Sequence, residues 1–362
     1  MGLKAINGIM LALFLVSMVT MLFNIAPTTA SQPVHNIDTL EDFAIIQAAI
    51  DDADTLDGHT ILVDAGTYHE HVVVDKSLTL IGENPSTTII DGNNTGRVIQ
   101  VSADNITVSG FAIRKSGGAI TDGGIFVAGY SGNNISRNIV INNLYFGIRL
   151  IYSSNNTVSG NNVTSNHLCG IHFDHSCNNT LTGNNVSSND VNGIYLGYSS
   201  NNNLTDNIVS TNTNGITLSN SSYNTVSGNN ISSNYYGIRL YGSSNNKIFH
   251  NNLINNIYQV TIQSHYNAWD DGYPSGGNYW SDHACTGNPS GGSQPYVIDA
   301  NNTDHYPFQD PDGWLLSSTP VGGISIPVNK LSLLAPYIGL TVLLAVAIVA
   351  VVYVKKRKRH KN

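Results

Sequence analysis

The chain has 362 residues, enough for one large domain or two small ones. Residues 31–330 hold all 24 acidic side chains against nine of the 16 basic ones, a net charge of −15 for this segment. A surface of that sign repels nucleic acid, so DNA and RNA are excluded as partners.

The first segment, residues 1–30, has the pattern of a secretory signal. It carries one early basic residue, Lys4, then an apolar run over residues 9–25 and the small-residue sequence PTTA. We expect cleavage after Ala30. Because the apolar run is long for a signal, an uncleaved membrane anchor is the alternative.

Residues 31–60 are predicted to form an N-terminal cap. The stretch TLEDFAIIQAAIDDAD (Thr39–Asp54) places Phe43, Ile46 and Ile50 on one face of a short amphipathic helix. We expect this helix to cover the first strand of the segment that follows, whose edge would otherwise be open to pairing with another chain.

The middle of the chain repeats one pattern, and its period predicts the fold. Sequences of the form G-I-x-L begin 22 or 23 residues apart, at Gly147, Gly170, Gly193, Gly215 and Gly237. Each copy holds three short runs of alternating apolar residues, none long enough for a helix. A leucine-rich repeat needs leucines at several fixed positions, and this sequence lacks them. We predict an all-β fold, a parallel β-helix of about ten coils over residues 61–265, about 45 Å long at a rise of about 4.8 Å per coil.

Asparagines recur once per coil in three files, and we expect them at the corners. One file consists of Asn138, Asn161, Asn184, Asn207, Asn229 and Asn251. The other two lie five residues earlier and five residues later in each coil. Asparagine tolerates the left-handed backbone of a sharp corner, and its amide can bond to the copies above and below. A ligand-binding wall of asparagines is the alternative.

Two sequence patterns resemble a known family. The opening stretch TILVDAGTYHEHVVVDKSLTLIGE and the asparagine-rich coils resemble the right-handed parallel β-helix of the NosD family, within the wider superfamily of carbohydrate-binding and sugar-hydrolase β-helices. NAWDDGYPSGGNYWSD (Asn267–Asp282) is similar to the cap of archaeal cell-surface proteins with such coils. The resemblance covers residues 40–310. It implies right-handed winding and copper handling during the maturation of nitrous oxide reductase.

No cofactor is certain from the sequence, and copper and calcium are the candidates. Copper(I) carriers favour thioether and thiolate ligands, but all four methionines lie within residues 1–30. Calcium prefers oxygen ligands, and the stretch His283–Gln294 in the cap has no acidic residue. The aspartates that could still gather around calcium are Asp270, Asp271, Asp282, Asp299 and Asp304.

The stretch CGIHFDHSC (Cys169–Cys177) concentrates metal-ligand side chains. The apolar positions of G-I-x-L point inward, so His172 between them points outward. An extended strand holds the two cysteines more than about 10 Å apart, too far for a disulfide. The candidate metal ligands, acting as surface pairs rather than as one tetrahedral site, are His167, Cys169, His172, Asp174 and Cys177.

The same stretch supplies the constellation that comes nearest to an active site. Lyases and epimerases of acidic sugars use clustered acids beside a basic residue. The weak candidates here are Asp174, His172, His175 and Arg149. Because the segment is strongly acidic, it repels polyuronates; enzyme activity is left open but is not expected.

Aromatic side chains at coil spacing, with arginines beside them, are the candidates for ligand binding. Such rings stack on the apolar faces of sugars, and arginines bond sugar hydroxyls. Mutual stabilisation of the coils is the alternative role. The residues are Tyr130, Tyr152, His175, Tyr198, Arg149 and Arg239.

After the coils we predict a Trp- and Gly-rich cap (266–312), a linker (313–332), a transmembrane helix (333–354) and a basic cytoplasmic tail (355–362). The 22 uncharged residues Leu333–Val354, at about 1.5 Å each, span a bilayer core of about 30 Å. Since basic flanks stay in the cytoplasm, we expect a single-pass membrane protein with its coils outside the cell.

Exposure outside the cell makes N-x-S/T sequons candidates for glycosylation. They include Asn105, Asn134, Asn155, Asn162, Asn185 and Asn230. The sequence as a whole predicts a membrane-anchored cell-surface protein that binds polysaccharides or envelope glycans without catalysis, as in adhesion. Copper handling of the NosD type is the first alternative, and a polysaccharide lyase or epimerase is the second.

Overall fold

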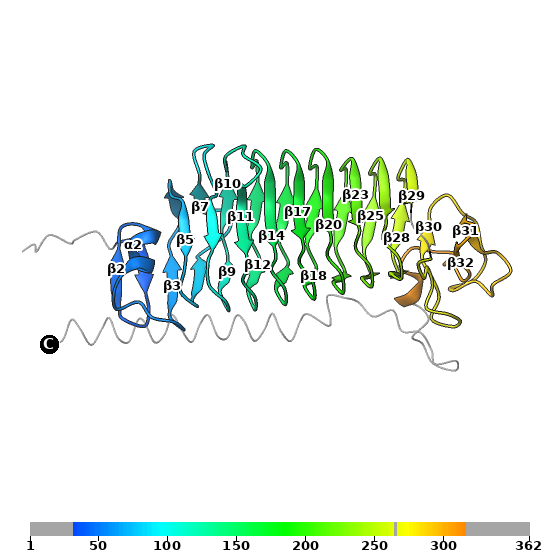
Figure 1. The fold of residues 1–362 in the computed structure, drawn as a ribbon, viewed down its shortest axis with the longest axis horizontal. Helices are drawn as coiled ribbons and strands as arrows, with labels where there is room; N and C mark the ends of the chain where they lie inside the picture. The colour runs from blue at the N-terminus through cyan, green and yellow to red at the C-terminus, as the bar shows by residue number, and fades with distance from the viewer. Residues whose placement is uncertain (1–31, 264–265, 316–362) are drawn as a thin grey trace, which may run out of the picture. The chain divides into compact units, whose positions relative to one another are not determined.

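A computed structural model describes residues 32–263 and 266–315, and they form an all-β solenoid of about ten turns (Figure 1). Successive strands along the chain belong in turn to three sheets, which we call A, B and C. The predicted all-β parallel solenoid of about ten coils is thereby confirmed, whereas its bounds at residues 61 and 265 and its right-handed winding stay predictions.

Sheet A, in spatial order, consists of β2 (Glu41–Phe43), β1 (Val34–Asn36), β3 (Thr60–Val63), β6 (Thr79–Gly82), β9 (Thr107–Ser109), β12 (Asn134–Ser136), β15 (Thr157–Ser159), β18 (Thr180–Thr182), β21 (Asn203–Thr205), β24 (Thr225–Ser227) and β27 (Lys247–Phe249). Sheet B consists of β30 (Tyr279–Trp280), β28 (Asn252–Ile254), β25 (Asn230–Ser232), β22 (Ile208–Ser210), β19 (Asn185–Ser187), β16 (Asn162–Thr164), β13 (Ile139–Ile141), β10 (Ala112–Arg114), β7 (Thr88–Asp91) and β4 (Gly66–Tyr68). Sheet C consists of β29 (Tyr258–Gln263), β26 (Tyr236–Tyr241), β23 (Asn214–Ser219), β20 (Asn192–Gly197), β17 (Cys169–Asp174), β14 (Phe146–Ile151), β11 (Gly123–Ala128), β8 (Ile99–Val101) and β5 (Val72–Val74).

Period-two alternation builds one continuous core inside the coils. In β15, Val158 is fully buried between the half-buried Thr157 and Ser159. In sheet C, Ile148 of β14 pairs with Ile171 of β17, and both are fully buried. Each coil buries only a few apolar side chains, so the core exists only because coils stack on one another.

The asparagine files are hydrogen-bonded ladders, as predicted. The backbone N–H and the side-chain amide of Asn161 both donate to Oδ1 of Asn184 in the next coil, at 3.0 Å each. The amide of Asn184 also donates to the carbonyl of Val158, at 2.8 Å. Both asparagines are buried, so these bonds satisfy polar groups that water cannot reach.

The prediction that the ladder asparagines adopt the left-handed backbone of the corners is wrong. At the two corners that flank β16, the left-handed residues are Gly160 (φ 61°) and Ser165 (φ 57°), each directly before a ladder asparagine. The asparagine therefore does not supply the left-handed conformation; it supplies hydrogen bonds once its neighbour has turned the chain.

The N-terminal helix is shorter than predicted. Of Thr39–Asp54, only α2 (Ile46–Asp51) is helical, because Glu41–Phe43 pairs instead with β1 as β2. The helix contacts the edge of sheet C: the Gln47 side-chain amide donates to the Val73 carbonyl and accepts from its N–H, at 3.2 and 2.7 Å. Its role as a cap stays a prediction.

The predicted signal, membrane span and tail lie outside the described residues, as does most of the predicted linker. The part that is described ends with a short 3-10 helix, Gly313–Leu315. Within residues 32–263 and 266–315, no helix has the length and apolar character that a membrane span requires.

Candidate functional site

Strand β17 carries the cysteine- and histidine-rich stretch, and its apolar residues point inward as predicted. Cys169, at its start, is only 2% exposed, and Asn192 donates to its sulfur at 3.3 Å. Burial raises the pKa of the Cys169 thiol to about 12, although the bonds from Asn192 oppose the shift. The thiolate that a metal requires is therefore disfavoured.

His172 faces outward, in register with Arg149 and Tyr195 of the neighbouring coils. Its ring lies between the rings of Phe146 and Tyr195, with centroids 4.7 and 5.0 Å away. Burial, helped by the charge of Arg149, lowers the pKa of His172 to about 4. The ring is thus neutral at physiological pH, and its buried Nδ1 has no hydrogen-bond partner.

The remaining candidate ligands form separate pairs. His167 lies against Asp190 of the next coil, and Asp174 contacts His175 through its Oδ1 and the ring Nδ1 at 2.9 Å. Cys177 accepts a hydrogen bond from the N–H of Ser200 at 3.3 Å. The five proposed metal ligands therefore do not meet at one point.

All three cysteines are free, which confirms that Cys169 and Cys177 are not joined. Across the described ranges, one group of three His, Cys, Asp or Glu side chains brings its ligand atoms within 4.8 Å of one another, and it lies elsewhere, near α2. It consists of the acids Glu41, Asp52 and Asp54.

The residues considered for catalysis do not converge either. Arg149 is 8% exposed; its guanidinium lies 4.4 Å from the centre of the Phe146 ring and donates to the carbonyl of Ile120. Asp174 is engaged with His175, and His172 is packed between rings. The four side chains lie in one region of sheet C, but they do not place a carboxylate beside a basic side chain that has no other contact.

Three of the four aromatic residues predicted at coil spacing form a column of exposed rings, in which His175 and Tyr198 stack within 16° while Tyr152 is tilted by 34° to His175. Ring centroids lie 4.9 Å apart for Tyr152 and His175, and 4.8 Å apart for His175 and Tyr198. All three residues have a left-handed backbone, φ 49°, at the corner after sheet C. Tyr152 is 67% exposed and Tyr198 56% exposed. We call these three residues the ring file.

Tyr130 does not belong to the ring file. Ala128 pairs with Ile151, so Gly129 occupies the position that Tyr152 holds in the next coil. Tyr130 falls one residue later, where the next coil has Ser153, and packs partly buried against the core. The repeat is 23 residues long here, whereas Tyr130 and Tyr152 are 22 apart.

Arg239 lies farther along sheet C in an aromatic setting. Its guanidinium lies 4.4 Å from the centre of the Tyr236 ring and 4.8 Å from that of Tyr241. It also donates to Oδ1 of Asn214 at 2.7 Å. Arg239 is half-buried, so it offers a ligand less than its full hydrogen-bonding capacity.

At the C-terminal end, two of the three asparagine ladders finish on the buried acceptors Asp304 and Asn302, a role that sequence reasoning missed. Asn278 continues the Asn251 file, and its backbone N–H donates to Asp304 at 2.7 Å. Trp280 donates its indole N–H to the same carboxylate at 2.8 Å. A second ladder ends on Asn302, and the third ends on Gln259, whose side-chain oxygen accepts from Asn256. Burial raises the pKa of Asp304 to about 7, against the opposing hydrogen bonds.

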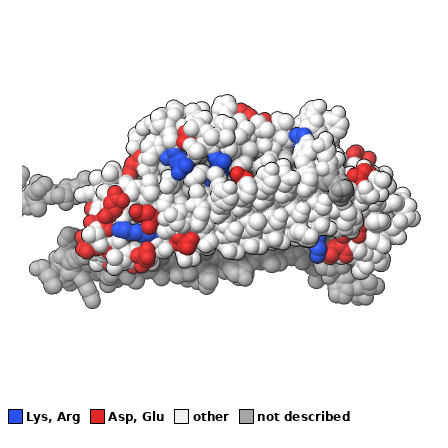
Figure 2. All heavy atoms as spheres, in the orientation of Figure 1, with Lys and Arg blue, Asp and Glu red and all other residues white. Residues whose placement is uncertain are grey.

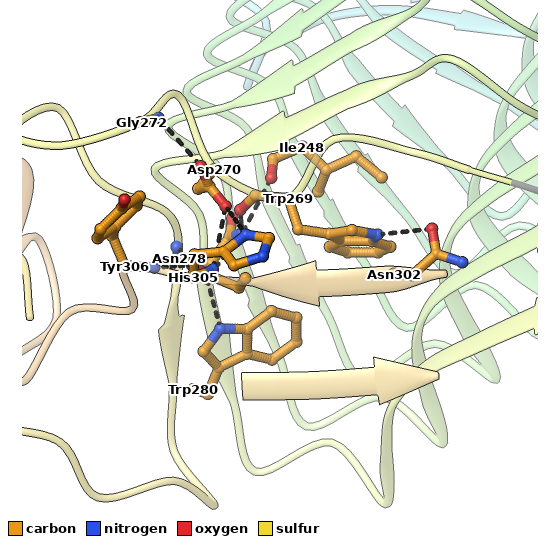
Figure 3. Close-up of polar contacts among 10 residues, drawn as sticks. Ile248, Trp269, Asp270, Gly272, Asn278, Trp280, Asn302, His305 and Tyr306 are labelled. Carbon is orange, nitrogen blue, oxygen red and sulfur yellow. Dashed lines mark hydrogen bonds and ion pairs between the residues drawn. The ribbon is translucent and has the colours of Figure 1, made fainter. Parts of the chain in front are cut away.

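The five aspartates proposed for calcium are engaged separately. One oxygen of Asp270 accepts from the backbone N–H of His305 at 3.0 Å and contacts its Nδ1 at 2.9 Å, while the other accepts from Gly272 (Figure 3). Asp304 is buried, and Asp282 pairs with Tyr296. A hollow of about 340 Å³ lies beside Asp270 and His305, lined also by Tyr266, Asn267, Ala268, Trp269, Ala300, Asn301 and Thr303.

The outer surface of the middle coils is nearly uncharged. On the face shown in Figure 2, Asp and Glu gather mainly toward the two ends of the stack. From residue 138 to 266, three basic and three acidic side chains balance: Arg149, Asp174, Asp190, Asp206, Arg239 and Lys247. Among the predicted sequons, Asn105, Asn155, Asn162 and Asn185 are exposed, whereas Asn134 and Asn230 are half-buried.

Comparison with solved structures finds β-helices of low sequence identity. The Dettilon tailspike protein (gp208) is 16% identical, with a TM-score of 0.44 over 57% of this chain and 54% of its own. The pectate lyase Pel9A is 16% identical, with a TM-score of 0.44 over 64% and 75%. The A-module of the Azotobacter vinelandii mannuronan C-5 epimerase AlgE6 is 15% identical, with a TM-score of 0.39 over 62% and 85%.

Comparison of sequences finds a partial relative and a family. A cell surface glycoprotein of Methanothermus fervidus is 37% identical over 114 residues, which cover 32% of this chain but 18% of that protein. Residues 80–285, more than half of the chain, match the family described as periplasmic copper-binding protein (NosD). The resemblance expected from the coils is confirmed, and the chain belongs to the NosD family.

Proposed function

We propose that this protein stands on the cell surface, anchored in the membrane, and binds neutral glycans of the envelope without catalysis. The observation that carries the proposal is the ring file, Tyr152, His175 and Tyr198, whose side chains stack and yet stay exposed. Exposed stacked rings on a rigid solenoid give a sugar an apolar platform that needs no reordering on binding.

The surface location rests on two kinds of support. One is the partial likeness to a cell surface glycoprotein. The other is the predicted signal at residues 1–30 and the predicted membrane span at residues 333–354. With coils outside the cell, the exposed sequons would carry glycans and the ring file would face other envelope polymers.

The charge pattern favours a neutral ligand. Three basic and three acidic side chains between residues 138 and 266 give that surface no net charge. Of the two arginines there, Arg149 is buried against Phe146 and cannot reach a carboxylate of a polyuronate. Amides and hydroxyls dominate the outer positions of the coils, and they suit sugar hydroxyls.

Copper handling is the family-level alternative, and the described residues do not fit it. Copper(I) prefers thiolate and thioether ligands, but Cys169 is buried with a raised pKa. The buried Nδ1 of His172 lacks a partner, yet among the described residues neither His172 nor Cys177 belongs to a group of three potential ligands. We therefore assign no copper chemistry to these coils.

Binding to a sugar panel tests the proposal. The full chain in detergent is titrated calorimetrically with maltohexaose, cellohexaose, chitohexaose and a galacturonate hexamer. We expect a neutral hexasaccharide to bind and the acidic one not to bind. The triple variant Tyr152→Ala/His175→Ala/Tyr198→Ala loses that binding, because the platform is gone.

The matched control is Tyr223→Ala, which removes a tyrosine that is 63% exposed on a left-handed backbone (φ 60°) but lies outside the ring file. We expect this variant to bind like the unmodified protein. The proposal is wrong if no neutral sugar binds, or if the triple variant binds as tightly as the control.

A further inference from the structure

The ring file leaves few ring faces available to a ligand. Its centroid spacings, 4.9 and 4.8 Å, match the rise of about 4.8 Å between coils. His175 therefore has Tyr198 stacked on one face and the ring of Tyr152, tilted by 34°, against the other. A sugar cannot enter between rings already at stacking distance, so a face-on contact is confined to the outer faces of the two end rings.

The two ends of the ring file differ. Register continued past Gly197 and Ser219 brings Asn220 (φ 50°) to the position after Tyr198, so a side chain already stands beyond that ring. At the other end the equivalent residue is Gly129 (φ 82°), which has no side chain. A Cβ atom added to Gly129 would meet no heavy atom within 4 Å.

Gly129 thus leaves an open position one coil high against the outer face of Tyr152. The greater exposure of Tyr152, 67% against 56% for Tyr198, agrees with this open face. The contact between His175 and Asp174, 2.9 Å long, fixes the ring behind Tyr152 and holds the platform in place. The solenoid therefore offers a flat aromatic face with space for one further ring.

We propose that one neutral pyranose residue stacks on the face of Tyr152 that points away from His175, in the open position at Gly129, as the next ring of the file. A pyranose fits because one of its faces is apolar and its rim of hydroxyls stays in water at this exposed corner. The coils from residue 138 to 266 have no net charge, so they offer an acidic sugar no net electrostatic attraction. The inference rests on the proposed glycan binding and adds the ring face that makes the contact.

Variants at the two ends of the file test the inference, with the neutral hexasaccharide that binds best in the panel as the probe. Tyr152→Ala removes the platform, and Gly129→Asn fills the open position with a side chain that offers no ring face, as Asn220 does beyond Tyr198. We expect each to weaken binding about tenfold or more, equivalent to about 1.4 kcal/mol. Tyr198→Ala, at the opposite end, is expected to change affinity less than about twofold, because the face it exposes lies away from the ligand.

A conservative variant and folding controls distinguish loss of the binding face from loss of the folded structure. Tyr152→Phe keeps the ring and is expected to bind within about threefold of the unmodified protein, since stacking needs the face rather than the hydroxyl. Circular dichroism and thermal unfolding establish that each variant is folded. Gly129→Asn suits the left-handed backbone of this position, because Asn220 adopts it (φ 50°) at the same position two coils beyond His175.

The outcomes separate this inference from the proposed function. If Tyr152→Ala and the filled Gly129 variant bind normally while the triple variant does not, the sugar uses ring edges and the inference is wrong, but glycan binding stands. Equal losses in Tyr152→Ala and Tyr198→Ala also overturn it. If the unmodified protein binds no sugar, both proposals fall.

Discussion

Asp304 illustrates how one buried residue completes a long-range pattern. In every ladder the asparagine of one coil donates to the asparagine of the next, so the last member has donors left over. Asn278 is such a last member, and it donates both its backbone N–H and its side-chain amide to Asp304. A carboxylate has two oxygens and no donor, so it accepts these bonds and the bond from Trp280.

The price of that arrangement is the burial of a negative charge. Because burial raises the pKa of Asp304 from its ordinary value of 3.8 to about 7, the folded state holds the proton more tightly than the unfolded state does. The resulting stability is complete below about pH 4 and is lost as pH rises through about 7, a change on the order of 4 kcal/mol.

We predict that Asp304→Asn removes this part of the pH dependence. The neutral amide still accepts from Trp280 and Asn278 but has no proton to lose. Denaturant unfolding at pH 4, 5.5 and 7.5, followed by tryptophan fluorescence, should show the unmodified protein losing stability relative to the variant. Asp206→Asn, at an exposed acid of the coils, is the control and should follow the unmodified protein. Parallel curves for all three proteins would contradict the prediction.

Individual side chains were predictable where the repeat fixed their direction. The outward position of His172 and the inward positions of Ile171 and Phe173 follow from alternation, and the structure agrees. The burial of the His172 Nδ1 does not follow, because it depends on the rings of Phe146 and Tyr195 in the neighbouring coils. The role of Asp304 at the ladder end also escaped prediction, since its partner Asn278 is 27 residues after Asn251 and so breaks the period.

At the scale of the element, the corners hold the coils together. Asn184 accepts two bonds from Asn161 and donates to Val158 and to Asn207, and it is 1% exposed. Removing its side chain leaves the backbone N–H of Asn161 buried without an acceptor, and the Asn161 amide keeps only its bond to the Ile135 carbonyl. Such unsatisfied groups cost about 1–3 kcal/mol each.

We predict that Asn184→Ala lowers the free energy of unfolding by about 3 kcal/mol or more. The adjacent Asn185→Ala provides a matched control, because that side chain is exposed at the start of β19 and should cost less than about 0.5 kcal/mol. Denaturant unfolding measures the loss of stability in both variants. The proteins are made in a host without N-glycosylation, because Asn185 is the first residue of an N-x-S sequon. Similar losses for the two variants would refute the role given to the ladder.

Elements followed from the sequence wherever the repeat was regular. Glycine spacing and three short alternating runs gave the coils, because parallel stacking forces the same side chains into the same places. The predicted N-terminal helix is too long, because the spacing of Phe43, Ile46 and Ile50 fits one face of a helix whether or not residue 43 is helical. Pairing of Glu41–Phe43 with β1 is a contact between segments, which a local period does not encode.

At the scale of the whole molecule, membership of the NosD family does not determine which ligand the protein binds. Residues 80–285 match the NosD family. The features that repeat along the described coils are corner asparagines and inward apolar residues, which serve the fold. Ligands are recognised by the outward positions, which the fold leaves free to vary. Here those positions carry an exposed ring file and a cysteine-rich strand whose ligands do not meet.

We therefore propose that these coils present a surface for glycans and hold no copper. Anaerobic titration of the full chain with copper(I) against a chromophoric chelator tests it most directly, alongside a Cys169→Ser/His172→Ala/Cys177→Ser variant. Both proteins share the four methionines of residues 1–30, so only a difference between them reports on the coils. We predict identical titrations for the two proteins. One tightly bound copper per unmodified chain that the variant loses would contradict the account.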